Sequence, residues 1–132
     1  MFRAFLVKLL LRLISWFPLS VAHGLGRLIG RLFNSYSNEL SRITRRNIEL
    51  CFPNLNEQQR DELVCETLMQ TAMAILECGA LWLWPMERVL KTVQKVSGWE
   101  LMEKARAEGK GVVFAAPHLG AWEIIGLYSA KH

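Results

Sequence analysis

The sequence predicts an α/β protein in which an N-terminal membrane-anchor and helical region leads into the start of a βαβ core, incomplete at its C-terminus. Three observations support this prediction: a basic, leucine-rich beginning, apolar residues at helical spacing over 56–84, and alternating short apolar runs and a helix from residue 88. We therefore expect a membrane-anchor or amphipathic helical region over 1–33, a helical region over 34–87 and the first part of an α/β core over 88–132.

The charge of the chain is concentrated near its beginning. The 132 residues carry 16 Lys and Arg against 12 Asp and Glu, a formal net charge of +4. Before Asn34 no acidic residue occurs, while five basic residues do, with His23 as a sixth if it is protonated: Arg3, Lys8, Arg12, Arg27 and Arg31. Such a segment suits an anionic membrane surface. Nucleic acid is excluded as a partner because no recognised binding motif accompanies the charge.

The first apolar segment leaves three possibilities open. Its uncharged part, 13–26, contains Pro18 and is shorter than the about 20 apolar residues of a clean membrane-spanning helix. The segment could span with its basic residues reaching the interface, or lie in the interface as an anchor, which we favour slightly. A cleaved signal peptide is the third possibility, but Lys8 and Arg12 interrupt its apolar core.

A second helix is predicted to begin at Ser20, whose hydroxyl can cap it. Its apolar residues form a stripe at helical spacing: Val21, Leu25, Leu28, Ile29 and Leu32. Arg27 and Arg31 fall on the opposite side. That basic side either meets lipid phosphates or is a solvated face of a packed helix.

A third helix is predicted from Asn38 to Leu50, ending before Pro53. Arg45 and Arg46 lie within it. Because arginine binds phosphate through two parallel hydrogen bonds, these two residues are candidates for contact with a substrate or lipid headgroup. The alternative is that such a cluster is solvated or pairs with the glutamates of the same helix.

The clearest helix follows, since Asn56 and Gln59 form a capping box and apolar residues recur behind it up to a break at Pro85. Trp82 and Trp84 near its end fit a core, a membrane interface or the lining of an apolar-chain site. The chain's three cysteines are far apart, which indicates a reduced protein without disulfides or a zinc knot.

From residue 88 the order predicted is strand, helix, strand. The strands are Val89–Val96 and Val112–Ala115, and Ser97 or Gly98 precedes the helix Trp99–Glu108. Such an order implies a right-handed crossover between parallel strands. Ligands of parallel sheets bind beyond the carboxyl ends of the strands. His118 would lie in that position.

His118 and Glu123 are the candidate catalytic residues. Five residues apart, they would lie about 140° apart on one continuous helix, but a turn at Gly120 could bring them together. An imidazole held by a carboxylate is a general base able to take a proton from a hydroxyl that attacks an acyl group. The alternative is a hydrogen-bonded structural histidine. One histidine and one carboxylate are too few ligands for a zinc site, so we expect no metal.

Two segments resemble a known family. Val93–Glu123, with its Gly-Lys-Gly, apolar run and His-x4-Glu succession, and Thr44–Pro53, with Thr-Arg-Arg-Asn-Ile-Glu, are similar to the lipid A late acyltransferases, the bacterial lauroyl and myristoyl transferases related to glycerolipid and lysophospholipid acyltransferases. The resemblance covers roughly the whole chain. One departure is Ala121, where many relatives carry Asn, a side chain able to bond the backbone of the turn.

The resemblance implies an α/β acyltransferase core and an enzyme of lipopolysaccharide biosynthesis in the bacterial inner (plasma) membrane, its catalytic part facing the cytoplasm. It implies transfer of a fatty acyl group from an acyl carrier protein thioester to a hydroxyl of a lipid A precursor. In that reaction His118 would be the base and Glu123 its orienting partner, and no cofactor is needed. Because the family continues well beyond residue 132, we expect this chain to be an N-terminal fragment that is incomplete by itself.

Two other functions compete with this one. A non-catalytic, basic, amphipathic membrane-binding module, or a truncated remnant, would explain residues 1–50 equally well, but not the His-x4-Glu cluster. A lipid hydrolase with a serine nucleophile is disfavoured because the G-x-S-x-G motif does not occur.

Overall fold

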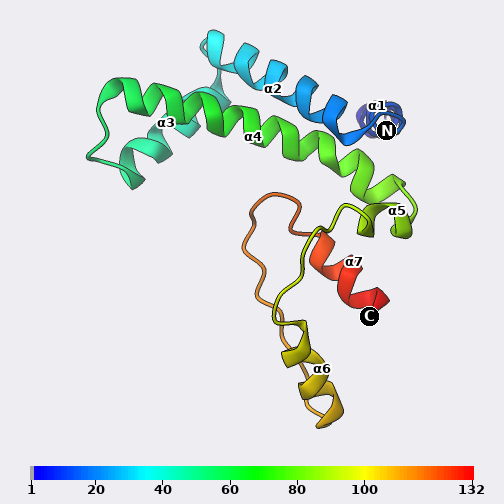
Figure 1. Ribbon diagram of the computed structural model, residues 1–132. Coiled ribbons are helices and arrows are strands. Elements are labelled where there is room, and N and C mark those ends of the chain that lie inside the picture. Colours follow the sequence, from blue (N-terminus) through cyan, green and yellow to red (C-terminus); the bar gives the residue numbers. More distant parts are fainter. Residues whose placement is uncertain (1) are drawn as a thin grey trace. The chain divides into compact units, whose positions relative to one another are not determined.

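The computed structural model describes residues 2–132, with side chains from Ala4 onward, so Met1 and the side chains of Phe2 and Arg3 lie outside the described part. The chain divides into two compact units, unit 1 over Met1–Leu83 and unit 2 over Trp84–His132. Unit 1 holds α1 (Phe2–Ile14), α2 (Leu19–Ser35), α3 (Glu39–Cys51) and α4 (Glu57–Leu83), and unit 2 holds α5 (Met86–Leu90), α6 (Trp99–Ala107) and α7 (Ile124–Lys131) (Figure 1). The division into the regions 1–33, 34–87 and 88–132 stays a prediction.

The predicted α/β fold with a βαβ core is wrong, because no residue between 2 and 132 forms a strand. The first expected strand, Val89–Val96, begins inside α5, which starts directly after Pro85; a proline with φ fixed near its helical value favours such a start. The second, Val112–Ala115, lies in a segment with neither helix nor strand, where Val113 is 96% exposed. Apolar runs provide the side chains of a strand but not the hydrogen-bonding neighbour that a sheet requires.

α4 is the central helix of unit 1, and its predicted start is confirmed. The backbone N–H of Gln59 donates to Asn56 Oδ1 at 2.9 Å, and the N–H of Asn56 donates to Gln59 Oε1 at 3.0 Å. This reciprocal pair satisfies two donors at the helix start. α4 ends at Leu83, just before Pro85, as predicted.

α3 packs on the first half of α4 (Figure 1). Its predicted start is also confirmed, because Asn38 Oδ1 accepts a hydrogen bond from the Ser41 N–H at 2.9 Å. Val64 and Leu68 of α4 and Ile48 of α3 form one buried apolar cluster. Burying each of these side chains contributes about 1.5–3 kcal/mol, so this cluster anchors the helix pair.

α2 lies along α4 through a face that is almost free of side chains (Figure 1). Ala22, Gly26 and Gly30 are buried there, four residues apart. A Cβ added to Gly30 would lie 2.4 Å from the Cα of Met69, and one added to Gly26 would lie 2.7 Å from the Cα of Met73. The spacing Gly-x-x-x-Gly therefore brings the two backbones into direct contact, as it does between membrane helices.

The apolar stripe predicted on α2 is largely exposed instead of packed. Val21, Leu25, Leu28 and Leu32 are between 37% and 53% exposed, whereas Ile29 packs on the core. The predicted cap at Ser20 is wrong, because α2 begins at Leu19 after Pro18 without a side-chain cap.

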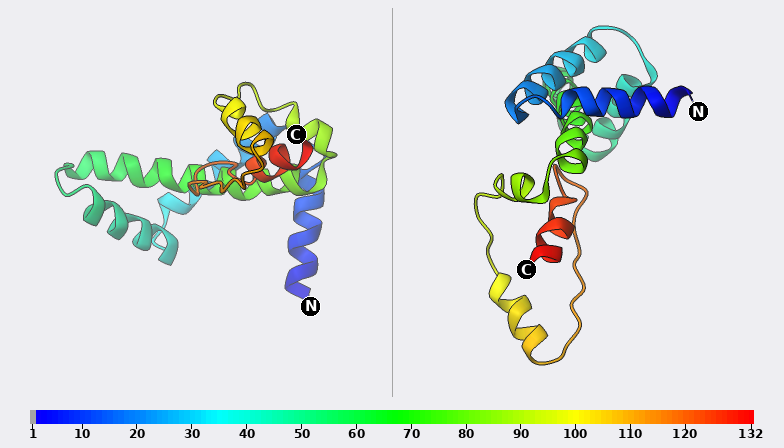
Figure 2. Two further views of the ribbon diagram at one scale, coloured as in Figure 1. Left: turned by 90° about the horizontal axis from the view of Figure 1, so that it is seen from below. Right: turned by 90° about the vertical axis from the view of Figure 1, so that its right-hand side faces the viewer.

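α1 lies across the C-terminal half of α4 (Figure 2). Only its end is buried: Ile14 packs with Ala22 and Leu76, and a Cβ on Gly79 of α4 would lie 2.9 Å from the carbonyl oxygen of Leu11. Most of its apolar side chains are exposed, among them Phe5, Leu6, Leu9, Leu10 and Leu13. α1 thus presents a broad apolar surface.

Unit 2 is held by fewer contacts. Gly98, with φ 79°, precedes α6, which matches the predicted helix to within one residue. The ring of Trp99 packs edge-on against that of Tyr128 in α7, with centroids 4.8 Å apart. Arg88 stacks over the ring of Trp84, with its guanidinium carbon 3.7 Å from the ring centroid.

Candidate active site

His118 lies in the segment that joins α6 to α7, and its side chain is exposed. The N–H of Leu119 donates to the Pro117 carbonyl at 2.8 Å, and Gly120 adopts a φ of 54°, in the left-handed region that favours glycine. The chain therefore does turn at Gly120. The turn leads directly into α7.

The ring of His118 packs against Trp122. The two ring centroids are 4.4 Å apart, with the planes tilted by 39°. This contact restricts the orientation of the imidazole from one side. Sequence reasoning gave Trp122 no role, because the two rings meet across a turn and not on one helix.

Glu123 is the N-cap residue of α7 and is half-buried. Its backbone carbonyl accepts the Gly126 N–H at 3.1 Å, which fixes the start of the helix beneath the carboxylate. His118 and Glu123 thus lie on either side of one turn, with Trp122 between them in sequence. A direct hydrogen bond from the imidazole to Glu123 stays a prediction.

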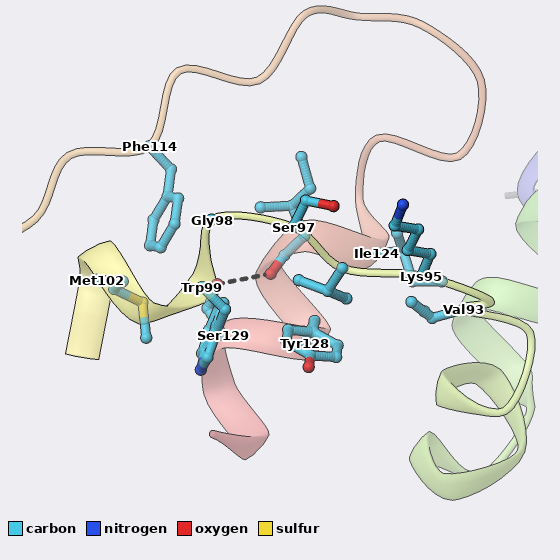
Figure 3. A pocket seen from close by; sticks show the side chains of 12 residues that line it. Val93, Lys95, Ser97, Gly98, Trp99, Met102, Phe114, Ile124, Tyr128 and Ser129 are labelled. Carbon is cyan, nitrogen blue, oxygen red and sulfur yellow. Dashed lines mark hydrogen bonds between the residues drawn. The ribbon is translucent and has the colours of Figure 1, made fainter.

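Glu123 borders a hollow of about 400 Å³ with mostly apolar walls. Trp122, Ile125, Phe114 and Ala116 line it together with Glu123. A second hollow, of about 390 Å³, adjoins Phe114 and Ile125 and is lined by Trp99, Met102 and Tyr128 among others (Figure 3). Both volumes lie within the about 300–1,000 Å³ typical of small-molecule sites. Apolar walls beside a carboxylate suit an apolar substrate with one reactive polar group.

Arg45 and Arg46 are in α3 of unit 1, and each has a carboxylate partner. Arg45 pairs with Asp61 of α4, and Arg46 Nη1 lies 3.3 Å from Glu49 Oε2. The alternative of pairing within the helix is therefore realised for Arg46. Since their side chains are 41% and 67% exposed, both guanidiniums also face solvent. Their role in binding a substrate or headgroup stays a prediction.

Sequence reasoning missed a second histidine–glutamate pair. His23 Nε2 of α2 lies 2.5 Å from Glu77 Oε1 of α4, beside the glycine contact between these helices. The two residues are 54 positions apart, so no spacing rule could have joined them. The pair ties α2 to α4 in addition to the packing. Within residues 2–132, no three His, Cys, Asp or Glu side chains gather closely enough to hold a metal ion.

Known proteins resemble this chain throughout. A family model described as bacterial lipid A biosynthesis acyltransferase matches residues 1–132. A lipid A biosynthesis acyltransferase of Haemophilus influenzae is 37% identical over 111 residues, which are 82% of this chain and 34% of that protein. The lipid A biosynthesis lauroyltransferase of Escherichia coli K12 is 30% identical over 112 residues, 85% of this chain and 36% of the relative. The lipid A biosynthesis palmitoleoyltransferase of Escherichia coli K12 is 31% identical over 109 residues, which are 83% of this chain and 35% of that protein.

This chain therefore spans about a third of the length of the curated relatives that it matches. No solved structure is significantly similar to it.

Proposed function

Since this chain belongs to the bacterial lipid A biosynthesis acyltransferase family, we propose that it is part of an enzyme that transfers a fatty acyl group to a hydroxyl of a lipid A precursor. The donor in this proposal is an acyl carrier protein thioester. The observation that carries the proposal is the turn at Gly120 between His118 and Glu123, with His118 packed against Trp122 and Glu123 beside an apolar hollow.

In the proposed reaction a ring nitrogen of His118 takes the proton of the acceptor hydroxyl. The oxygen attacks the thioester carbonyl, the carbon–sulfur bond breaks, and the leaving thiolate receives a proton from the imidazolium. Glu123 orients the ring and stabilises its positive charge. The packing of Trp122 against His118 supports the same role, because it limits the positions that the imidazole can take.

The backbone donors at the start of α7 are already engaged. The N–H of Ile124 donates to the Ala121 carbonyl at 3.0 Å, and the N–H of Ile125 donates to the Trp122 carbonyl at 3.2 Å. The proposal therefore assigns no oxyanion donor to these two groups.

The proposed location is the inner membrane, with the catalytic part on the cytoplasmic side. Unit 1 supports association with a membrane, because exposed apolar side chains cover α1 and one side of α2, and the basic side chains of Lys8, Arg12, Arg27 and Arg31 are exposed on the same two helices. α4 is the one described helix long and apolar enough to cross a membrane, by length and composition alone. Surface binding and spanning both remain compatible with this surface.

The same surface favours the competing function, a membrane-binding module without catalysis. This second proposal needs only unit 1 and assigns no role to His118. The two functions differ in one measurable respect, since only the first requires an imidazole at position 118.

The test is acyl transfer by the natural protein that contains these residues. His118→Ala should lower transfer to a lipid A precursor, followed by mass spectrometry of the product, by at least 100-fold, the lower end of what a positioned acid–base group contributes. Leu119→Ala is the matched control, because Leu119 is in the same turn and 75% exposed. Undiminished transfer by His118→Ala would contradict the catalytic role of His118, whereas absence of transfer by the natural protein, with membrane binding retained, would favour the module.

A further inference from the structure

The contact between His118 and Trp122 brings the faces of two aromatic rings together. Their centroids are 4.4 Å apart and their planes are tilted by 39°. Rings that meet edge to face stand close to perpendicular, as those of Trp99 and Tyr128 do at 87°. The smaller tilt and the shorter distance at His118 therefore turn the imidazole toward the face of the indole.

Trp122 is the better fixed partner in this contact. It is half-buried, whereas His118 is exposed. The backbone carbonyl of Trp122 accepts the Ile125 N–H at 3.2 Å, which ties residue 122 to the first turn of α7. The indole face is thus presented to His118 by a part of the chain that is held in place.

A proton on His118 would strengthen this contact. The face of an aromatic ring carries a negative partial charge, and among the side chains indole attracts cations best. A cation within about 6 Å of the ring centroid is attracted electrostatically. The imidazole lies well within this distance. A neutral imidazole gains only packing from the same contact, so Trp122 holds the charged ring more strongly.

We propose that Trp122 is a positioning residue whose indole face stabilises the imidazolium that forms on His118 during acyl transfer. As the acceptor O–H bond breaks, an N–H bond forms on the imidazole, so positive charge develops over the indole in the transition state. The charge disappears when the leaving thiolate takes the proton. The neutral ring of the ground state gains nothing from this term, so the effect falls on kcat. The inference rests on the proposed function, because the imidazolium forms only if His118 is the base.

The test places fluorinated tryptophans at position 122 of the natural protein that contains these residues, in membranes. Each added fluorine withdraws electron density from the indole face, while the size and shape of the ring change little. Transfer is measured at about pH 8.5, where an ordinary imidazole is neutral. There kcat should fall stepwise with each fluorine, by about two- to fivefold in all, the range of an exposed cation–π contact. KM should stay unchanged.

Trp16 is the matched control position, because it is 70% exposed and lies in unit 1. The same fluorinated residues there should leave kcat unchanged. Trp122→Phe keeps a weaker aromatic face and should lose less activity than Trp122→Leu, which keeps only apolar volume. A kcat that does not respond to fluorination at position 122, a response as large at Trp16, or equal activity of the Phe and Leu variants would overturn the proposal.

NMR spectra of protein with isotope-labelled histidine test the contact without any measurement of activity. The ring current of the indole should move the ring C–H signals of His118 upfield in the natural protein and in each fluorinated form. The displacement should disappear in Trp122→Leu. Its absence from the natural protein would overturn the proposal, since the imidazole would then not lie at the indole face.

A combined substitution keeps this inference apart from the proposed function. If His118 is the base, the residual transfer of His118→Ala should not depend on fluorination at Trp122. A loss of transfer in His118→Ala, together with no fluorine dependence in the natural protein, overturns the role of Trp122 alone. Undiminished transfer in His118→Ala overturns the base itself, and the role of Trp122 with it.

Discussion

Unit 1 and unit 2 differ in how their helices are held. In unit 1, α3 and α4 start at side-chain caps, and apolar side chains are buried between the helices, with Val64 and Leu68 almost fully inaccessible. In unit 2 the helices have five to nine residues and are joined by long segments without secondary structure, and Val113 is almost fully exposed. A capped, periodic sequence thus forms its structure with nearby partners, whereas an apolar run without a pairing neighbour does not.

The largest loss of stability is expected where one methyl group is added at the contact between α2 and α4. Gly30→Ala should cost about 3 kcal/mol of unfolding free energy, because the new Cβ would lie 2.4 Å from the Cα of Met69. Gly24→Ala on the same helix meets nothing within 4 Å and should be neutral or stabilise by up to about 1 kcal/mol. Urea unfolding followed by circular dichroism measures both. Equal effects would contradict the direct backbone contact.

Substitution of one valine in each unit compares how much a buried and an exposed side chain contribute to stability. Val64→Ala should cost about 2 kcal/mol, because it leaves a cavity in a core where Val64 is 0% exposed. Val113→Ala should change the unfolding free energy by less than about 0.5 kcal/mol, because that side chain is 96% exposed. The same unfolding measurement applies. A cost at Val113 comparable to that at Val64 would mean that the segment before α7 is packed in solution.

The smallest expected effect is a change in the pKa of Glu87, at the contact between α5 and α7. A hydrogen bond from its own backbone N–H, and then the hydrogen bond and charge of Lys131, hold the pKa of the Glu87 carboxyl below its ordinary value of 4.5. Lys131→Gln should raise this pKa only partly, because the backbone bond remains. Carboxyl NMR titration measures it. Lys110→Gln is the control, since Lys110 pairs with Glu108.

The sign of the pH dependence follows from the direction of this shift. A carboxyl with a lowered pKa in the folded state adds stability above pH 4.5, and that stability is lost as the pH falls through the folded-state pKa. Glu87 is mostly exposed, so the effect on unit 2 is small. A stabilising response to acid between pH 4.5 and the folded-state pKa would be inconsistent with this sign.

Local signals predicted much of the fold. Three helix boundaries depend only on residues close in sequence, and the structure confirms all three: the cap at Asn38, the Asn56–Gln59 capping box and the break at Pro85. The α/β fold class was wrong because pairing between strands depends on residues distant in sequence. Likewise, a search for large apolar residues drew attention to Leu25 and Leu28, whereas the packing face of α2 is made by Gly26 and Gly30.

The residues of the candidate site come from a local sequence pattern and their roles stay a prediction, whereas their surroundings were not predicted. A histidine followed by glycine and glutamate after an apolar run is a local pattern, so His118 and Glu123 could be named. The contact between His118 and Trp122, the hollow beside Glu123 and the His23–Glu77 pair depend on how the chain folds back. None of them follows from spacing alone.

The glycine face of α2 also matters while the chain is being made. Gly26 and Gly30 leave the ribosome about 40 residues before Met69 and Met73, the partners that cover them. During this delay the glycine face of α2 exposes little apolar side-chain surface, so it offers little to which a wrong partner could bind. The same two glycines that allow the final close contact therefore leave this face of α2 with little apolar side-chain surface until α4 has been synthesised.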